Sequence, residues 1–248
     1  MSGPLRLWSH RWPRALADML LPCSCALCGD TAPAVVCTPC RQRYAGAGGP
    51  RCPSCANPLG AREPAGQRCA GCLADPPAFD ATVAAADYAA PLDTLVLRLK
   101  FGAQLPLAPW FAKQLHDAVL ADPGRPLPEL LCPVPLGPRR LAERGFNQAL
   151  EIARPLAASL GLPLAPRLLV RSVDTRAQSG VAPRERADNI RGAFALAGAA
   201  PEQLDGRHVG VVDDVMTSGH TLNEVAATLK RAGAARVSNL VFARTPPH

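Results

Sequence analysis

The pattern of hydrophobic positions changes character near residue 80. Beyond that point, short apolar runs alternate with longer segments in which apolar residues recur at helical spacing. The short runs predict strands over residues 81–88, 130–135, 192–196, 209–215 and 236–243, and the longer segments predict helices over 92–101, 106–120, 149–160 and 222–229. Alternating strands and helices are typical of an α/β fold built on a parallel sheet, so we expect such a domain over residues 80–248.

Before residue 80 the chain is poor in large apolar residues and rich in cysteine. Eight of the ten cysteines form four C-x-x-C pairs, which are Cys25 and Cys28, Cys37 and Cys40, Cys52 and Cys55, and Cys69 and Cys72. Each pair can offer two thiolates to one tetrahedral zinc ion. Because the segment lacks the residues for a core of its own, metal must supply its fold. We therefore predict one or two structural zinc ions in a double zinc ribbon over residues 23–79.

The pairing of the cysteines is open at this stage. Sequential pairing gives two ribbons in tandem, and a cross-braced arrangement is the alternative. Redox-active pairs would need a βαβ context, which this segment lacks. Cys23 lies two residues before the first ligand and is an alternative to it, whereas Cys132 lies in an apolar run and is predicted to be buried.

The first 22 residues predict neither a secretory signal nor a membrane span. Pro13 and Asp18 interrupt the apolar residues there, and the chain has no apolar run of about 18 residues. We expect a cytoplasmic protein with a short N-terminal helix over residues 1–22. Attachment to a membrane surface through Trp8 and Trp12 is the alternative.

The most informative stretch is 209–221. Four valines give it the character of a strand covered on both faces, and Asp213 and Asp214 fall at the end where α/β sheets bind ligands. We expect both carboxylates to be exposed. A turn rich in hydroxyl groups follows and leads into a helix, and its candidate ligand-binding residues are Thr217, Ser218, Gly219 and Thr221. The N-terminus of a helix suits a phosphate, and paired carboxylates suit ribose hydroxyls and magnesium. The alternative is that Asp213 and Asp214 only cap the next helix, but a cap needs one carboxylate rather than two.

Two basic segments can meet a polyanion, because the forked guanidinium of arginine suits bidentate phosphate contacts. Residues 135–148 are predicted to form a rigid loop that carries Arg139, Arg140 and Arg144. Residues 171–191 form a long polar segment without periodicity, which is typical of a functional loop, and it offers Arg176, Arg184 and Arg186 to close over a pyrophosphate. A solvated turn and a disordered segment are the respective alternatives.

The stretch 209–221 resembles the loop of type I phosphoribosyltransferases that binds phosphoribosyl pyrophosphate (PRPP). Further motifs make the resemblance specific: RGFNQ at 144–148, DTRAQ at 174–178, RADNIR at 186–191 and VVDDVMT at 211–217. Behind the cysteine pairs, these motifs resemble the ComF family over nearly the whole chain. That family joins a zinc-binding module to a type I phosphoribosyltransferase-like domain and is associated with natural competence.

The ComF resemblance implies ligands and roles that the residues alone do not establish. It implies PRPP with magnesium, single-stranded DNA and a competence helicase as ligands and partners. It also implies that Asp213 and Asp214 hold the ribose, that the following turn holds the 5′-phosphate, and that Arg144 with its neighbours holds the pyrophosphate. Ser218 stands where many members have a second threonine, and it keeps the hydroxyl group.

Two functions remain open on the sequence alone. A phosphoribosyltransferase would bind PRPP with magnesium and act on an acceptor that no residue here identifies. A non-catalytic nucleic-acid-binding module would use the PRPP site as a ligand sensor. The net charge of +7, and ten arginines against five acidic residues over 139–191, favour phosphate binding. Because aromatic residues make up only 4% of the chain, we expect DNA contact to be mainly electrostatic.

Overall fold

A computed structural model describes residues 23–46, 48–60, 66–171, 192–198 and 204–246. The helix predicted over residues 1–22 and the segment that holds Arg176, Arg184 and Arg186 lie outside the described residues. The chain forms two compact units, residues 1–43 and 44–248. The sequence prediction placed all four C-x-x-C pairs in one segment, residues 23–79. In the structure the last two pairs, from Cys52 to Cys72, belong to the same compact unit as the sheet.

The first unit is a short hairpin followed by a helix. Strands β1 (Cys23–Ser24) and β2 (Thr31–Ala32) pair in antiparallel fashion, and α2 (Thr38–Tyr44) follows. The tight turn between the strands is closed by a hydrogen bond from Gly29 N to Cys25 O of 2.9 Å. The unit therefore presents one cysteine pair on the hairpin turn and the other at the start of the helix.

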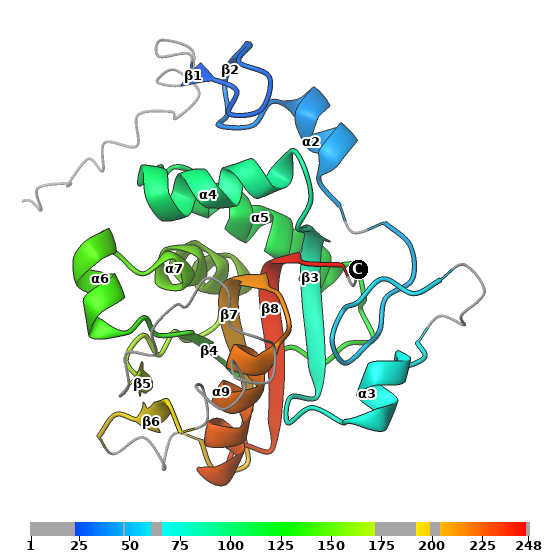
Figure 1. Ribbon diagram of the computed structural model, residues 1–248, viewed down its shortest axis with the longest axis vertical. Helices are drawn as coiled ribbons and strands as arrows, with labels where there is room; N and C mark the ends of the chain where they lie inside the picture. The colour runs from blue at the N-terminus through cyan, green and yellow to red at the C-terminus, as the bar shows by residue number, and fades with distance from the viewer. Residues whose placement is uncertain (1–22, 47, 61–65, 172–191, 199–203, 247–248) are drawn as a thin grey trace, which may run out of the picture. The chain divides into compact units, whose positions relative to one another are not determined.

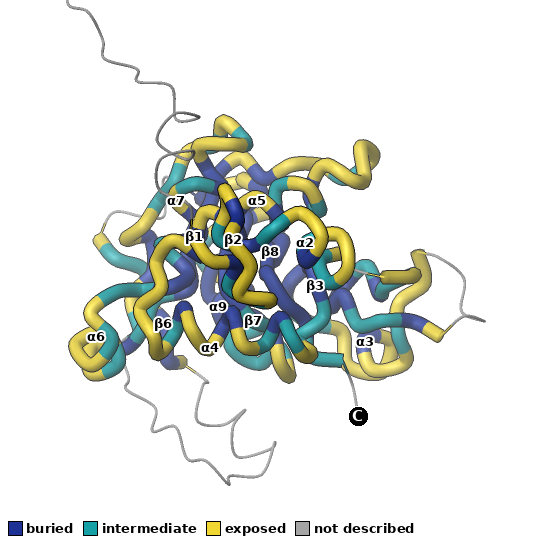
Figure 2. The backbone as a smooth tube through the Cα atoms, turned by 90° about the horizontal axis from the view of Figure 1, so that it is seen from above, coloured by how far each residue is buried: buried dark blue, intermediate teal, exposed yellow. Residues whose placement is uncertain are grey.

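The second unit is built on a parallel sheet, as the alternating pattern predicts. Its strands are β3 (Ala81–Asp87), β4 (Leu130–Pro133), β7 (His208–Met216) and β8 (Arg236–Arg244), in the order β3-β8-β7-β4 (Figure 1). Burial on both faces explains their continuous apolar runs, since helices and loops cover the sheet on each side (Figure 2). The α/β architecture is thus confirmed.

Helices α5 (Leu107–Leu120) and α7 (Gln148–Leu160) pack against each other and against the strands. Helix α9 (His220–Arg231) packs on β7 and β8 and lies in front of them in Figure 1. The shorter α3 (Ala70–Ala74) and the helix α4 (Leu92–Gly102) also belong to this unit. The buried faces match the predicted stripes, because Leu222, Val225 and Leu229 of α9 all lie in the core.

Two predicted segments differ from the structure, one in its secondary structure and one in its place in the sheet. The segment 135–148 is not a loop throughout, because residues Pro138–Arg144 form the helix α6. Pro138 presets the first helical turn, and Gly145, with a φ of 79°, ends it. The strand predicted at 192–196 is β6 (Phe194–Leu196), which pairs antiparallel with β5 (Leu169–Arg171) outside the parallel sheet. Only Phe194 of its three residues is buried, as expected of a small two-stranded sheet with one covered face.

The buried His208 at the start of β7 gives a testable pH dependence. Its ring lies 2.8 Å from Ser238 Oγ and 3.1 Å from Leu127 O. Burial, followed by the charge of Arg236, lowers the pKa of His208 below its usual 6.5. As the pH falls, the unfolded chain takes up this proton before the folded protein does. The free energy of unfolding should therefore decrease below about pH 6.5, until the pH reaches the lowered pKa.

Urea denaturation between pH 7 and pH 5 measures this effect. His208→Asn keeps a polar side chain but cannot titrate, so the variant should lose part of the decrease. Equal slopes in the parent and in His208→Asn would contradict the expectation.

Candidate functional site

The two carboxylates lie on β7 where its neighbour β4 has ended. Pro133, the last residue of β4, pairs with Val212, and Val134 N donates to Val212 O at 3.0 Å. β4 therefore does not pair with Asp213 and Asp214, although β7 itself continues to Met216. The sequence prediction that they are exposed is wrong, because Asp213 is 9% and Asp214 only 2% accessible.

A positive group lies beside this buried acidic pair. Lys100 Nζ, at the end of α4, lies 2.7 Å from Asp214 Oδ2. Burial and the neighbouring Asp214 raise the pKa of Asp213 well above its usual range, against the opposing effect of Lys100. Burial lowers the pKa of Arg144, while attraction to Asp214 and Asp213 opposes that shift, and Arg144 lines a pocket together with Lys100. A divalent cation bound here would offset the repulsion between the two carboxylates.

Helix α6 brings two of its three predicted arginines to a pocket of about 520 Å³. Arg140 and Arg144 line it, together with Lys100, Phe101, Ala103, Leu136, Glu143, Phe146 and Gln148. Arg139 lies instead on the outer side of the helix, 72% exposed, with its Nε 2.9 Å from Glu143 Oε1. The structure therefore separates Arg139 from the pocket that the other two arginines share.

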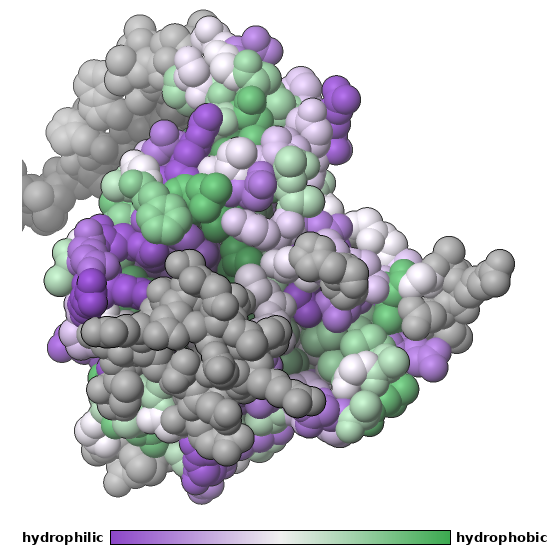
Figure 3. Space-filling model, in the orientation of Figure 1, coloured by the Kyte–Doolittle hydropathy of each residue, from purple (hydrophilic) through white to green (hydrophobic). Residues whose placement is uncertain are grey.

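Sequence reasoning missed Lys100, Phe101 and Gln148. Phe101 is 75% exposed, and the guanidinium of Arg144 lies 5.5 Å from its ring centroid. Arg144 also donates to Gln148 Oε1. A signal for Phe101 was present, because this aromatic residue falls off the buried stripe of α4 that contains Leu99. Figure 3 shows hydrophobic surface at the end of α4 next to hydrophilic surface over α6.

The hydroxyl-rich turn connects β7 to α9, as predicted. Thr217 and Ser218 are exposed, and Ser218 Oγ lies 3.2 Å from His220 Nδ1. Gly219 is the N-cap of α9, with a φ of 87°, and supplies no side-chain acceptor to the first N–H groups of the helix. An anion in the turn can therefore meet these N–H groups and the positive end of the helix dipole. We call residues 217–221 the phosphate turn.

Gly219 should be needed for the shape of the phosphate turn. A Cβ at this position would lie 2.7 Å from Met216 Cε, in a backbone conformation that L-residues rarely adopt. The left-handed conformation costs an alanine roughly 1–2 kcal/mol. We expect Gly219→Ala to lower the free energy of unfolding by about that amount and to weaken binding of ribose 5-phosphate. Chemical denaturation and calorimetric titration measure the two effects, and a variant unchanged in both would contradict the expectation.

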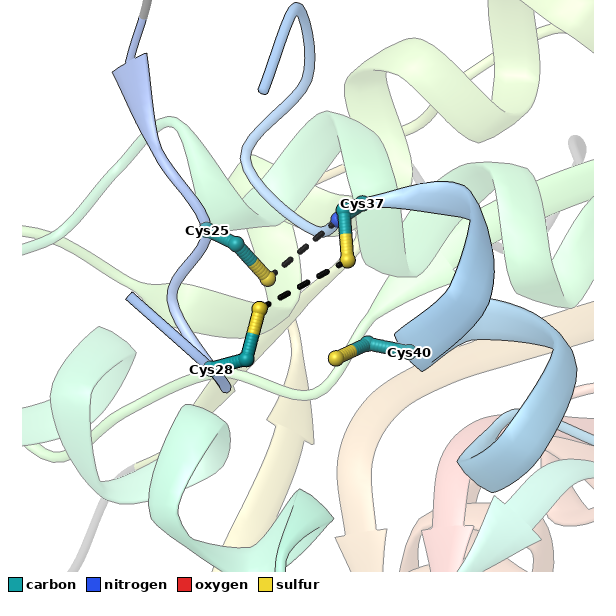
Figure 4. A group of neighbouring side chains, drawn as sticks. All are labelled: Cys25, Cys28, Cys37 and Cys40. Atoms are coloured by element: carbon teal, nitrogen blue, oxygen red, sulfur yellow. Dashed lines mark hydrogen bonds between the residues drawn. The ribbon is translucent and has the colours of Figure 1, made fainter. Parts of the chain in front are cut away.

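The cysteines form two tetrads with sequential pairing. The first tetrad is Cys25, Cys28, Cys37 and Cys40, and the second is Cys52, Cys55, Cys69 and Cys72. Within each tetrad all four sulfurs lie within 4.8 Å of one another, which rules out the cross-braced alternative. Figure 4 shows the sulfurs of the first tetrad pointing towards a common centre.

Both tetrads fit a tetrahedral zinc ion. The Cys28–Cys37 and Cys55–Cys69 sulfur pairs are 3.7 and 3.6 Å apart, and a Zn–S bond of about 2.3 Å implies a separation of roughly 3.8 Å. Burial raises the pKa of Cys25, but backbone N–H groups, including that of Cys37 at 3.3 Å, lower it to a net value of about 6. The same balance lowers the pKa of Cys52 to about 7. One thiol in each tetrad is thus readily ionised, whereas burial and neighbouring cysteines raise the pKa of Cys40, Cys55 and Cys72, which a bound zinc ion would have to deprotonate.

The two remaining cysteines lie outside the tetrads. Cys23 donates from Sγ to Ala32 O at 3.2 Å and does not replace Cys25 as a ligand. Cys132 is buried in β4, and burial raises its pKa, which confirms the prediction of an inert core residue. Among the described residues, no helix is long and apolar enough to cross a membrane.

Comparison with known proteins finds a matching domain family for the cysteine-rich part and for the sheet part of the chain. Residues 16–73 match the double zinc ribbon domain, and residues 147–247 match the phosphoribosyl transferase domain. The chain is 36% identical to DNA utilization protein YhgH of Salmonella typhi, over 99% of each chain. It is 35% identical to competence protein F of Haemophilus influenzae, over 72% of this chain and 79% of that protein.

Proposed function

Because the chain belongs to the family of DNA utilization protein YhgH and competence protein F, with a phosphoribosyltransferase domain and a double zinc ribbon, we propose that it binds PRPP with magnesium. The observation that carries this proposal is the buried carboxylate pair Asp213 and Asp214, with the candidate phosphate turn after it in the chain and Lys100 beside it. The phosphate turn begins at Thr217, three residues after Asp214. The positive charge of Arg144 is attracted to both carboxylates.

Each part of PRPP has a chemically suitable partner in this arrangement. The N-terminus of α9 and the hydroxyls of Thr217, Ser218 and Thr221 suit the 5′-phosphate. The carboxylates of Asp213 and Asp214 suit the vicinal ribose hydroxyls and would hold magnesium, for which oxygen ligands are preferred. Arg140 and Arg144 suit the pyrophosphate and, in a transfer reaction, would stabilise its negative charge as it leaves.

A phosphoribosyltransferase is the enzymatic form of this proposal, with the acceptor unidentified. When bound, magnesium would supply charge neutralisation of the pyrophosphate, and the protein groups would orient the ligand around it. Before the ligand binds, Lys100 would serve as the cationic partner of Asp214. Arg176, Arg184 and Arg186 remain candidates to cover the pyrophosphate.

The second candidate is a DNA-binding module that uses PRPP as a signal. The observation that favours it is Phe101, an exposed aromatic ring beside Arg144, Arg140 and Phe146 in a basic pocket. Aromatic rings next to cationic groups suit the bases and phosphates of a single strand, which adds stacking to the electrostatic contact expected from composition. Relatives named for DNA utilization and competence support this candidate, and a competence helicase remains a predicted partner.

Calorimetric titration with magnesium and PRPP tests the common part of both candidates. We expect saturable binding at one site per chain. Adding short single-stranded oligonucleotides or free nucleobases then distinguishes the two candidate functions. An enzyme releases pyrophosphate, and a sensor does not. A protein that takes up no PRPP with magnesium would overturn the PRPP site.

The arginines of α6 provide a prediction for DNA binding with a built-in control. Contact with phosphates releases counterions, at about 0.7 in the slope of log affinity against log salt for each phosphate on a single strand. Arg144→Gln should reduce the slope by roughly that amount. Arg139→Gln, on the outer side of the same helix, should leave it nearly unchanged. Fluorescence anisotropy over a salt series measures both, and equal slopes for the two variants would contradict an interface at this pocket.

A further inference from the structure

The second tetrad and the phosphate turn lie against each other. The two groups line a pocket of about 240 Å³, to which Cys55, Cys69 and Cys72 contribute on one side and Ser218, Gly219 and His220 on the other. Ala78, just after the tetrad, donates from its N–H to Asn223 Oδ1 in the first turn of α9 at 2.6 Å. Met216, the residue before the turn, shares one buried cluster with the cysteines of this tetrad.

One side chain bonds to both groups. Arg244, at the end of β8, is only 6% accessible. Its Nε donates to Cys55 O at 2.9 Å, and its Nη1 donates to Met216 O at 3.1 Å and to Thr217 O. Nη1 also donates to Thr245 O at 2.6 Å. The guanidinium therefore fixes the backbone at the entrance of the phosphate turn to the backbone of a predicted zinc ligand.

The surroundings explain how a buried charge is tolerated at this position. Arg244 donates to four backbone carbonyls, and it lines one pocket with Cys55, Cys69 and Cys72, whose sulfurs would carry negative charge as zinc ligands. Four thiolates around a zinc ion leave a net charge of −2, which a neighbouring guanidinium offsets. The tetrad thus holds Arg244 in place, and Arg244 holds the turn.

We propose that Arg244 is a positioning residue that transmits the fold of the second zinc ribbon to the phosphate turn. This inference rests on the proposed function, because it assigns the turn to the 5′-phosphate of PRPP. The guanidinium of Arg244 donates to backbone carbonyls on both sides. It acts by fixing the carbonyls of Met216 and Thr217, and thereby the direction of the N–H groups that follow them.

Arg51 offers a matched control. Its Nη1 donates to Ala56 O at 2.9 Å and its Nη2 lies 2.7 Å from Asp87 Oδ1, so it also ties the second ribbon to the sheet. Its side chain is nearly as buried, at 11%. Neither of these contacts involves the phosphate turn. Arg51→Met and Arg244→Met therefore remove similar links, of which only the second should affect the turn.

The test compares two fragments of PRPP by calorimetric titration: ribose 5-phosphate, which needs the turn, and magnesium pyrophosphate, which needs Arg140 and Arg144. We expect Arg244→Met to retain two zinc ions per chain, to bind ribose 5-phosphate at least tenfold more weakly, and to bind magnesium pyrophosphate within about twofold of the parent. Arg51→Met should keep the parent ratio of the two affinities, whatever it loses in melting temperature.

Equal losses for both fragments in Arg244→Met, or no loss for either, would overturn the inference, because a general structural role predicts the former and no role predicts the latter. If Arg244→Met loses zinc or fails to fold, Arg244→Lys replaces it in the same comparison of the two affinities. Lysine keeps the positive charge but lacks the forked guanidinium. A parent that binds neither fragment nor PRPP would sink the proposed function as well, whereas a parent that binds both alongside an unaltered variant sinks only the role of Arg244.

Discussion

Replacing Asp213 and Asp214 together by asparagine should weaken the binding of PRPP with magnesium at least tenfold, which corresponds to about 1.4 kcal/mol. Asparagine keeps the shape of the side chain and can still contact ribose hydroxyls. It removes the two negative charges that favour magnesium at this site. The loss should therefore be larger for PRPP with magnesium than for ribose 5-phosphate alone.

The stability of the same variant should change little or improve. Both carboxylates are buried, and the pKa of Asp213 is raised by burial and by Asp214. A folded-state pKa above the unfolded value means that folding stability decreases as the pH rises from about 3.8 through that pKa. The asparagine variant escapes this decrease, so its stability relative to the parent should rise with pH. The loss of the ion pair with Lys100 acts in the opposite direction.

A matched control is Asp117→Asn, which removes an exposed carboxylate that pairs with Lys113 on α5, 3.0 Å away. It should alter neither PRPP binding nor the pH dependence described for the carboxylate pair. A double variant that bound PRPP as tightly as the parent while melting far lower would mean that Asp213 and Asp214 serve the fold, and the PRPP site would have to be withdrawn.

The sequence predicted the sheet and the tetrads well because their signals are local. The valine-rich run of β7 reports burial on both faces, and the spacing of each C-x-x-C pair reports a metal knuckle. The helix α6 was missed because its seven residues bury no side chain and so leave no apolar period to detect. The burial of Asp213 and Asp214 was missed because it depends on residues distant in the sequence, such as Val241 of β8, which pairs with Asp213, and Lys100, which contacts Asp214.

Contacts between distant parts of the chain could not be predicted either, because they too depend on tertiary packing. Arg244 lies 189 positions from Cys55, to which it donates, and no local pattern links the two. Lys100 likewise lies in the last turn of α4, outside the apolar stripe that the sequence predicts for this helix. Its ion pair with Asp214 depends on tertiary packing. Composition placed a boundary near residue 80, whereas these contacts connect the second tetrad to the sheet across it.

The second large expected effect follows from that connection and distinguishes the two tetrads. Cys25→Ser and Cys52→Ser should each lower the zinc content from two ions per chain to one. Apparent binding free energies of structural zinc reach about 10–16 kcal/mol in small zinc fingers, which is comparable with the whole stability of a domain. Loss of the second ion should therefore affect whatever is packed around it.

Around the second tetrad that packing is the core of the sheet unit. Cys52, Cys55 and Cys72 share a buried cluster with Val211 of β7 and Leu222 of α9, whereas the first tetrad belongs to a separate compact unit. We expect Cys52→Ser to destabilise the main unfolding transition by on the order of 3 kcal/mol or more, roughly 6–12 °C for a unit of this size. Cys25→Ser should leave that transition nearly unchanged.

Differential scanning calorimetry with elemental analysis of the same samples measures both quantities. Serine conserves the size of the side chain, so the comparison isolates the metal from the packing of the cysteine itself. If Cys52→Ser lost one zinc ion yet melted like the parent, the second ribbon would be an independent module, as its composition suggests. If Cys25→Ser caused the larger loss, the buried cluster around Cys52 would not be where metal binding and the stability of the sheet are coupled.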